Sequence, residues 1–120
     1  LSRGAAHCVF VENDRAALAV LRSNIAALGI SDKSTVIAGD AVGTAAHQQG
    51  IDLLIADPPY GFDAWGGLLA SVTAPLVVLE SGRPIGPIAG FETVREKKYG
   101  RTHVAFLSPD SAPEGTVEVQ

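Results

Sequence analysis

The chain has 120 residues, of which 47% are hydrophobic and 18% are charged, enough apolar material for the core of one globular domain. Its formal net charge of −4 argues against a broad nucleic-acid-binding surface, which needs clustered Lys and Arg. The single cysteine, Cys8, excludes an internal disulfide and a Cys-based metal site. No apolar stretch is long enough to cross a bilayer and no signal peptide is evident, so a cytoplasmic protein is expected.

The chain begins with a predicted strand, a helix and a second strand. Residues 7–12 form a short apolar run that is typical of a buried parallel strand. A helix with a broad apolar face follows, which Asn13 or Asp14 caps at its start and Gly29 ends. Residues 35–38 then resume a strand. This order predicts a βαβ unit.

Strands continue to alternate with weaker helices in the middle of the chain. We expect a helix over 41–49, a strand over 51–56, a helix around 62–71 and a strand over 75–80. Alternation of this kind is typical of an α/β fold with a mostly parallel sheet.

The last part of the chain has the pattern of a β-hairpin. Residues 91–97 alternate in polarity, a turn lies around Gly100, and residues 102–107 are apolar again. The hairpin would add an antiparallel edge to the mostly parallel sheet. The polar residues 109–120 are predicted to form a disordered tail after a domain that ends at about residue 108.

The most informative motif follows the apolar strand and consists of Asp57, Pro58, Pro59 and Tyr60. Because proline fixes φ and restricts the preceding residue, the motif predicts a rigid turn at the carboxyl edge of the sheet, where α/β folds bind ligands. The Asp57 carboxylate and the proline carbonyls accept hydrogen bonds, and the Tyr60 ring offers a stacking face. A planar base with an amino group fits, its nitrogen lone pair aimed at an electrophile. An ordinary turn is the alternative for Asp-Pro alone.

This motif resembles that of the class I S-adenosylmethionine-dependent N-methyltransferases, whose amino-methylating members carry [Asp/Asn/Ser]-Pro-Pro-[Tyr/Phe/Trp] after the fourth strand. More narrowly, the chain is similar to the RsmD family of bacterial 16S ribosomal RNA guanine-N2 methyltransferases. Four further segments in order along residues 1–108 carry this resemblance: Leu1-Ser2-Arg3-Gly4-Ala5-Ala6-His7, Val9-Phe10-Val11-Glu12-Asn13-Asp14, Asn24-Ile25-Ala26-Ala27-Leu28-Gly29 and Lys98-Tyr99-Gly100. It implies a Rossmann-like class I methyltransferase fold with S-adenosylmethionine as methyl donor and with Asp57, Pro58, Pro59 and Tyr60 as the catalytic residues.

Two strand ends supply candidate residues for this cofactor. A carboxylate at Glu12 can accept both hydroxyls of a ribose, although an acid near a helix N-terminus is also favoured by itself. Asn13 contacts the adenine edge or begins the helix. The resemblance implies that Asp40 receives the adenine amino group and that the Ala41 backbone N–H meets a ring nitrogen, with a helix cap as the alternative for Asp40. Asp57 is assigned to both the catalytic and the cofactor-binding set.

The leading functional hypothesis is methylation of the exocyclic N2 of a guanine in 16S ribosomal RNA, with ribosomal RNA or a 30S assembly particle as partner. The alternatives are methylation of adenine N6 in DNA or of another planar amine such as a glutamine amide, and a non-catalytic domain of the same fold. Asp57 favours a nucleobase, because the resembled glutamine-modifying enzymes use Asn. No His or Cys spacing suggests a metal.

Two further groups of residues have open interpretations. Glu80 and Ser81 line the target pocket or cap the strand that they end. One basic cluster near an aromatic ring is a candidate RNA contact, with a solvated hairpin turn as the alternative; it comprises Arg95, Lys97, Lys98, Tyr99, Arg101 and His103.

The first residues indicate that the domain begins upstream. Leu1 to Ala5 predicts the end of a helix stopped by Gly4. The resemblance places a strand, a glycine-rich loop and a helix before this point, preceded by a basic extension that approaches RNA. That strand would lie between the strands ending at Glu12 and Asp57. We therefore expect residues 1–108 to be the C-terminal part of one methyltransferase domain, inactive by itself.

Overall fold

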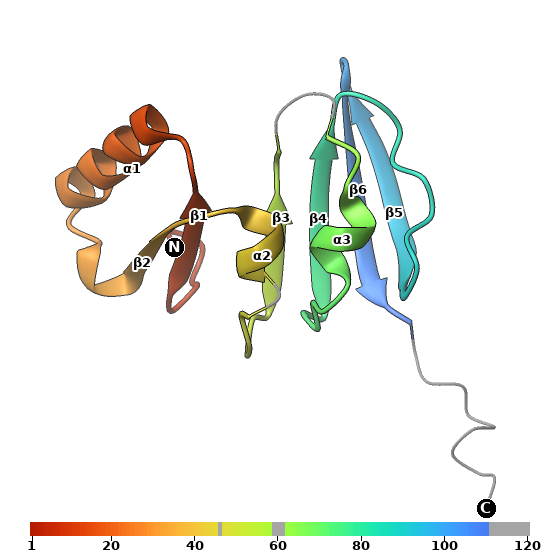
Figure 1. Cartoon of the computed structure of the whole chain (residues 1–120), viewed down its shortest axis with the longest axis horizontal. Coiled ribbons are helices and arrows are strands. Elements are labelled where there is room, and N and C mark those ends of the chain that lie inside the picture. The colour runs from red at the N-terminus through yellow and green to blue at the C-terminus, as the bar shows by residue number, and fades with distance from the viewer. Residues whose placement is uncertain (46, 59–61, 111–120) are drawn as a thin grey trace, which may run out of the picture. The chain divides into compact units, whose positions relative to one another are not determined.

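The computed structural model describes residues 1–45, 47–58 and 62–110 and divides into two compact units, Leu1–His47 and Gln48–Gln120 (Figure 1). Pro59 and Tyr60 of the predicted turn lie outside the described residues, and so do residues 111–120 of the predicted tail.

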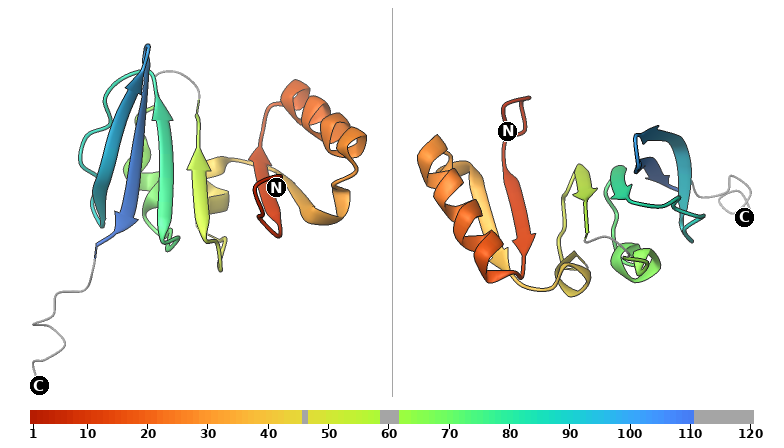
Figure 2. Two further views of the ribbon diagram at one scale, coloured as in Figure 1. Left: turned by 180° about the vertical axis from the view of Figure 1, so that it is seen from behind. Right: turned by 90° about the horizontal axis from the view of Figure 1, so that it is seen from above.

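The first unit is built on a pair of parallel strands with one long helix. Its elements are β1 (Cys8–Glu12), α1 (Arg15–Leu28), the short 3₁₀ helix η1 (Ser31–Lys33), β2 (Ser34–Ala38) and α2 (Ala41–Ala45). The strands pair from Cys8 with Ser34 to Glu12 with Ala38. α1 lies alongside this sheet with Leu18 and Ile25 buried (Figures 1 and 2). The predicted order of strand, helix and strand is confirmed.

Local signals set the ends of α1, as predicted. The Asp14 carboxylate accepts a hydrogen bond from the Ala17 backbone N–H at 2.8 Å, which caps the first turn. Gly29 ends the helix at a φ of 67°, in the left-handed region that glycine adopts without steric cost. Gly4 also has a positive φ, of 105°, and its N–H closes a turn onto the Leu1 carbonyl at 3.1 Å.

The second unit is a four-stranded sheet in the order β3-β4-β6-β5. Its elements are β3 (Leu53–Ala56), α3 (Trp65–Leu69), β4 (Leu76–Ser81), β5 (Phe91–Tyr99) and β6 (Thr102–Pro109). β3 and β4 are parallel, whereas β6 runs antiparallel to both β4 and β5. The predicted α/β class with a C-terminal antiparallel hairpin is confirmed.

Three middle elements are shorter than expected. The helix expected over 41–49 does not include residues 47–49; α2 covers Ala41–Ala45, where Gly43 and β-branched neighbours weaken helical propensity. The helix expected around 62–71 covers only Trp65–Leu69, two of whose five residues are glycines. The strand expected over 51–56 begins at Leu53, because its partner β4 begins at Leu76.

One face of the second sheet is packed, and the other face is open along β3 and at the start of β4. α3 covers the packed face, where Trp65, Leu68 and Leu69 are buried together with Val77 and Leu79 of β4 (Figures 1 and 2). On the other face the side chains of Leu53, Ile55 and Leu76 are 46%, 65% and 39% exposed. We call these three residues the open face. Among the described strands, β3 pairs with β4 alone, so its other edge carries unpaired backbone groups.

No helix in the described part of the chain combines the length and the apolarity that crossing a membrane requires.

Candidate functional site

Two carboxylates meet at the carboxyl end of the parallel pair in the second unit. Because Ala56 pairs with Leu79, the residues that follow them, Asp57 and Glu80, lie side by side. The pKa of the Glu80 carboxyl is raised, mainly by repulsion from Asp57 and further by burial and a side-chain hydrogen bond with Asp57. Strand register therefore holds two like charges close together.

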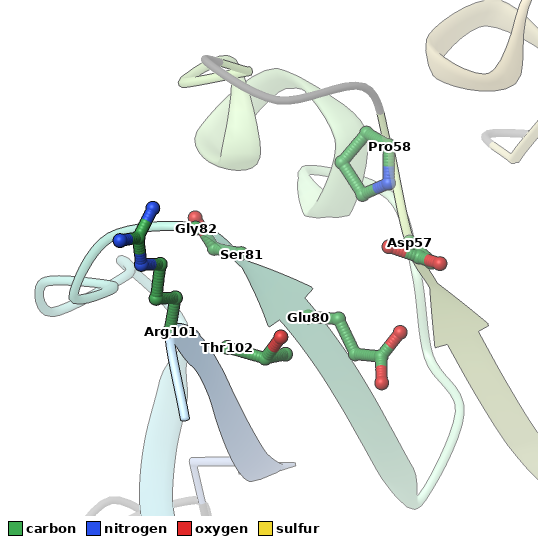
Figure 3. Close-up of a pocket in the computed structure, with 7 residues that line it drawn as sticks. All are labelled: Asp57, Pro58, Glu80, Ser81, Gly82, Arg101 and Thr102. Carbon is green, nitrogen blue, oxygen red and sulfur yellow. The ribbon is translucent and has the colours of Figure 1, made fainter. Parts of the chain in front are cut away.

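These carboxylates line a pocket of about 280 Å³ at the end of the sheet (Figure 3). Asp57 and Pro58 come from the end of β3, and the end of β4 contributes Glu80, Ser81 and Gly82. The hairpin turn adds Arg101 and Thr102. The turn reaches this end of the sheet because β6 runs antiparallel to β4, with His103 opposite Ser81. The pocket thus combines acidic acceptors with the hydroxyl and guanidinium donors of its other residues.

Asp57 and Pro58, the two residues of the predicted motif that the structure describes, line this pocket. The side chain of Asp57 is exposed and that of Pro58 is half-buried. Ser81 is already engaged as an acceptor, because its Oγ receives a 3.3 Å hydrogen bond from the Arg83 backbone N–H. Of the residues whose role the sequence left open, Glu80, Ser81 and Arg101 line the pocket.

Sequence reasoning did not single out the pairing of Glu80 with Asp57 or the part played by Thr102. An acid at the end of the strand next to β3 was the available signal for Glu80. That signal does not identify Asp57 as the neighbour of Glu80, because the register between two parallel strands is not visible in either strand alone. Thr102 gave no signal, since a threonine beside a hairpin turn is unremarkable.

The candidate cofactor residues Glu12 and Asp40 lie at the carboxyl ends of β1 and β2, within the first unit. Glu12 Oε2 accepts backbone N–H bonds from Asn13 at 3.0 Å and from Asp14 at 3.1 Å. Asp40 Oδ2 accepts the Gly43 N–H at 3.0 Å. These are the capping contacts that the sequence offered as alternatives, and the ligand roles of both residues stay predictions.

The chemistry of this strand edge fits a nucleoside. Both bonds to the Glu12 side chain use one oxygen, Oε2, and the Gly39 N–H ties the two strand ends together by bonding the Glu12 carbonyl at 3.1 Å. Two acidic acceptors beside the first turn of α2, which begins at Ala41, suit ribose hydroxyls and an adenine amino group. No group of three potential metal ligands occurs among the described residues.

The hairpin next to the pocket carries basic and aromatic side chains. Lys97 Nζ lies 6.0 Å from the centroid of the Tyr99 ring, at the outer limit of a cation–π contact. The Tyr99 side chain is 58% exposed and pairs across the turn with Thr102. An exposed ring and nearby cations are suited to stacking on a base and contacting a phosphate.

The fold and the two acidic strand edges define a class I methyltransferase type of α/β protein, and comparison with known proteins agrees. A solved conserved hypothetical protein from Streptococcus pyogenes is 28% identical, with a TM-score of 0.76 over 91% of this chain and 75% of that one. The structure described as "Putative methyltransferase yhhF" from Escherichia coli shares the fold, with 23% identity and a TM-score of 0.74 over 92% of this chain and 67% of that one.

Residues 1–108 match the family described as conserved hypothetical protein 95, and the chain belongs to this family. A curated relative from Bacillus subtilis (strain 168), "Putative rRNA methyltransferase YlbH", is 27% identical over 120 residues. The match covers 88% of this chain and 65% of that relative, so the chain spans less than two thirds of its length. These findings confirm the resemblance to RsmD-type class I methyltransferases.

Proposed function

We propose that the full-length protein is a cytoplasmic enzyme that transfers a methyl group from S-adenosylmethionine to the exocyclic N2 of a guanine in 16S ribosomal RNA. The observation that carries the proposal is the position of Asp57 and Pro58, which line a pocket at the carboxyl end of β3. Membership of the family and the description of the Bacillus subtilis relative as an rRNA methyltransferase support the reaction type and RNA as substrate.

The pocket residues have a defined chemical task in this proposal. The Asp57 carboxylate and the Pro58 carbonyl accept N–H bonds from the target amine and direct its lone pair outward. Asp57 also stabilises the positive charge that grows on the nitrogen as it gains a fourth bond, and the proton leaves afterwards. Early removal of a proton by a strong base is not needed. Pro59 and Tyr60, assigned by the motif, would complete the turn and stack on the base.

The first unit would hold the methyl donor. In this proposal Glu12 binds the ribose hydroxyls and Asp40 the adenine amino group, with Asn13 and the Ala41 backbone N–H beside them. When bound, S-adenosylmethionine supplies an electrophilic methyl group on a positively charged sulfur. The acidic strand edges suit a ligand that carries this positive charge.

We also propose that residues 1–108 are the C-terminal part of one domain and that an N-terminal segment completes the sheet. The open face and the unpaired edge of β3 support this proposal, because apolar side chains and backbone groups of that kind are normally covered. The net charge of −4 supports a second role for the segment, the supply of basic contacts to RNA or to a 30S assembly particle.

A labelling experiment tests the proposal. The full-length protein is incubated with radiolabelled S-adenosylmethionine and one substrate at a time. The four substrates are naked 16S ribosomal RNA, 30S particles, DNA and protein. Nucleoside analysis should find the label in N2-methylguanosine, and Asp57→Ala should abolish it. Label in DNA adenine or in glutamine would replace the proposal with one of the other amino-methyltransferases. Absence of transfer to all four substrates would favour a non-catalytic domain.

A further inference from the structure

Strand order arranges the polar groups of the pocket in a row. Moving across the sheet from β3 to β4 and then to β6, the polar side chains of the pocket are Asp57, then Glu80 with Ser81 after it, then the residues of the hairpin turn. The first two are carboxylates. Thr102 and Arg101 follow on the hairpin side and carry a hydroxyl and a guanidinium, which can donate hydrogen bonds (Figure 3). The row therefore reads acceptor, acceptor, donor.

The Watson–Crick edge of guanine has the complementary row. Its N2 amino group and its N1–H are adjacent donors, and its O6 is an acceptor. Adenine differs at the middle position, where N1 accepts a hydrogen bond instead of donating one. A pocket that receives a base removed from its stack reads this edge by such contacts.

We propose that Glu80 is a specificity-determining residue that selects guanine by accepting its N1–H, while Asp57 accepts the N2 amine and the hairpin donors face O6. This inference rests on the proposed function and assigns the recognition of the base within the same site. The parallel register supports it, because residues that follow the pair Ala56–Leu79 are side by side and can bond adjacent groups of one planar base.

Electrostatics favour the same base. The pKa of Glu80 is raised chiefly because the Asp57 carboxyl opposes a second negative charge beside it. Guanine donates an N–H to each carboxylate and so offsets this repulsion. Adenine would turn the lone pair of its N1 towards the ionised Glu80 carboxylate, adding a further acceptor where a donor is needed.

The test uses 2-aminopurine, which keeps the amino group at C2 but has an acceptor at N1 and no oxygen at C6. RNA fragments carrying the nucleotide found by labelling are made with guanosine, 2-aminopurine riboside or adenosine at that position. Binding to the full-length protein is measured by fluorescence anisotropy without methyl donor, and methyl transfer is measured under single-turnover conditions. Wild type should prefer guanosine over 2-aminopurine riboside by at least about 10- to 100-fold in both assays, because 2-aminopurine loses the charge-assisted bond from N1–H to Glu80 and also the contact of O6 with the hairpin donors.

Three variants isolate the contribution of Glu80. Glu80→Gln should reduce the preference by about 10-fold or more, because the glutamine amide can donate to the N1 of 2-aminopurine, and the preference that remains reports the O6 contact. Glu80→Asp should keep a preference for guanosine, because it keeps the carboxylate. The matched control is Glu92→Gln, which removes the same charge from an exposed residue of β5 at the end of the hairpin far from the turn and should retain wild-type selectivity.

Equal use of guanosine and 2-aminopurine riboside by the wild type would overturn the inference without reference to any variant. So would a folded Glu80→Gln protein, checked by its thermal transition, that keeps the full wild-type preference for guanosine or loses activity on both bases equally. These outcomes leave guanine methylation by the wild type intact. Failure of the proposed function would give a different result, because the wild-type protein would then place no label in N2-methylguanosine.

Discussion

Asp57 lies opposite Glu80 because the parallel register of β3 and β4 pairs Ala56 with Leu79 one residue earlier. The two carboxylates come from different strands, and each follows a run of apolar residues at the same edge of the sheet. Their proximity is a property of the sheet and not of a local turn. Substitutions of Asp57 and of Glu80 should therefore have different effects, which can be measured separately.

Asp57→Ala in the full-length protein should lower the rate of methyl transfer by about 10²- to 10³-fold, the usual effect of removing one preorganised polar contact. The affinity for S-adenosylmethionine should change little, because the lost acceptor orients the amine and does not hold the ribose. Single-turnover rates and calorimetric titration measure the two effects. Asp52→Ala, which alters an exposed acid just before β3, is the control. Near wild-type turnover in Asp57→Ala would exclude the assigned role.

Glu12→Ala should weaken S-adenosylmethionine binding by about 2–3 kcal/mol if both ribose hydrogen bonds are made. The same variant also removes the contacts of Glu12 Oε2 with the Asn13 and Asp14 N–H groups. Asp14→Ala separates the effects, since it deletes the N-cap of α1 at about 1 kcal/mol of stability and should leave the affinity nearly unchanged. Calorimetry that finds unaltered affinity in Glu12→Ala would leave only the capping role.

Glu80 should make the stability of the protein depend on pH. Its pKa is raised in the folded state, so the folded protein holds this proton more tightly than the unfolded chain. The resulting stabilisation is complete below the unfolded glutamate pKa of about 4.3 and is lost as the pH rises through the higher folded value. Relative to the wild type, Glu80→Gln should therefore gain stability as the pH rises above the unfolded glutamate pKa.

Urea denaturation across this pH range measures the gain. Asp57→Asn supplies the control, because it removes the charge that raises the Glu80 pKa. In the Asp57→Asn background, Glu80→Gln should produce a much smaller pH-dependent difference. A difference between wild type and Glu80→Gln that stays constant with pH would contradict the repulsion between the two carboxylates.

Tyr60→Phe should retain activity and Tyr60→Ala should lose it, because the motif requires an aromatic face and not the hydroxyl. Stacking of a base on an aromatic ring contributes about 1–3 kcal/mol. Tyr60 lies outside the described residues, so this prediction rests on the motif. Steady-state kinetics on an RNA substrate measure it. Equal loss in both variants would assign a chemical role to the hydroxyl.

Much of the fold was predictable because its signals are local. Asp14 and Gly29 end α1 through side-chain capping and a left-handed φ, and both can be read from residue type. The carboxyl end of β3 was predicted because prolines follow an apolar run. The pairing of Asp57 with Glu80 and the approach of Thr102 depend on register across strands that are distant in sequence, which local patterns do not specify. The lengths of α2 and α3 were overestimated because glycines within them were given too little weight.

The open face has a practical consequence for anyone who produces this chain by itself. Leu53, Ile55 and Leu76 expose apolar surface next to an unpaired strand edge, a combination that promotes association between copies. A polar substitution such as Ile55→Thr should therefore improve the solubility of the 120-residue chain. If the N-terminal segment covers this face, the same substitution should destabilise the full-length protein by about 1–3 kcal/mol. Opposite effects of this one mutation in the two proteins would show, without a further structure, that the N-terminal segment packs on the open face.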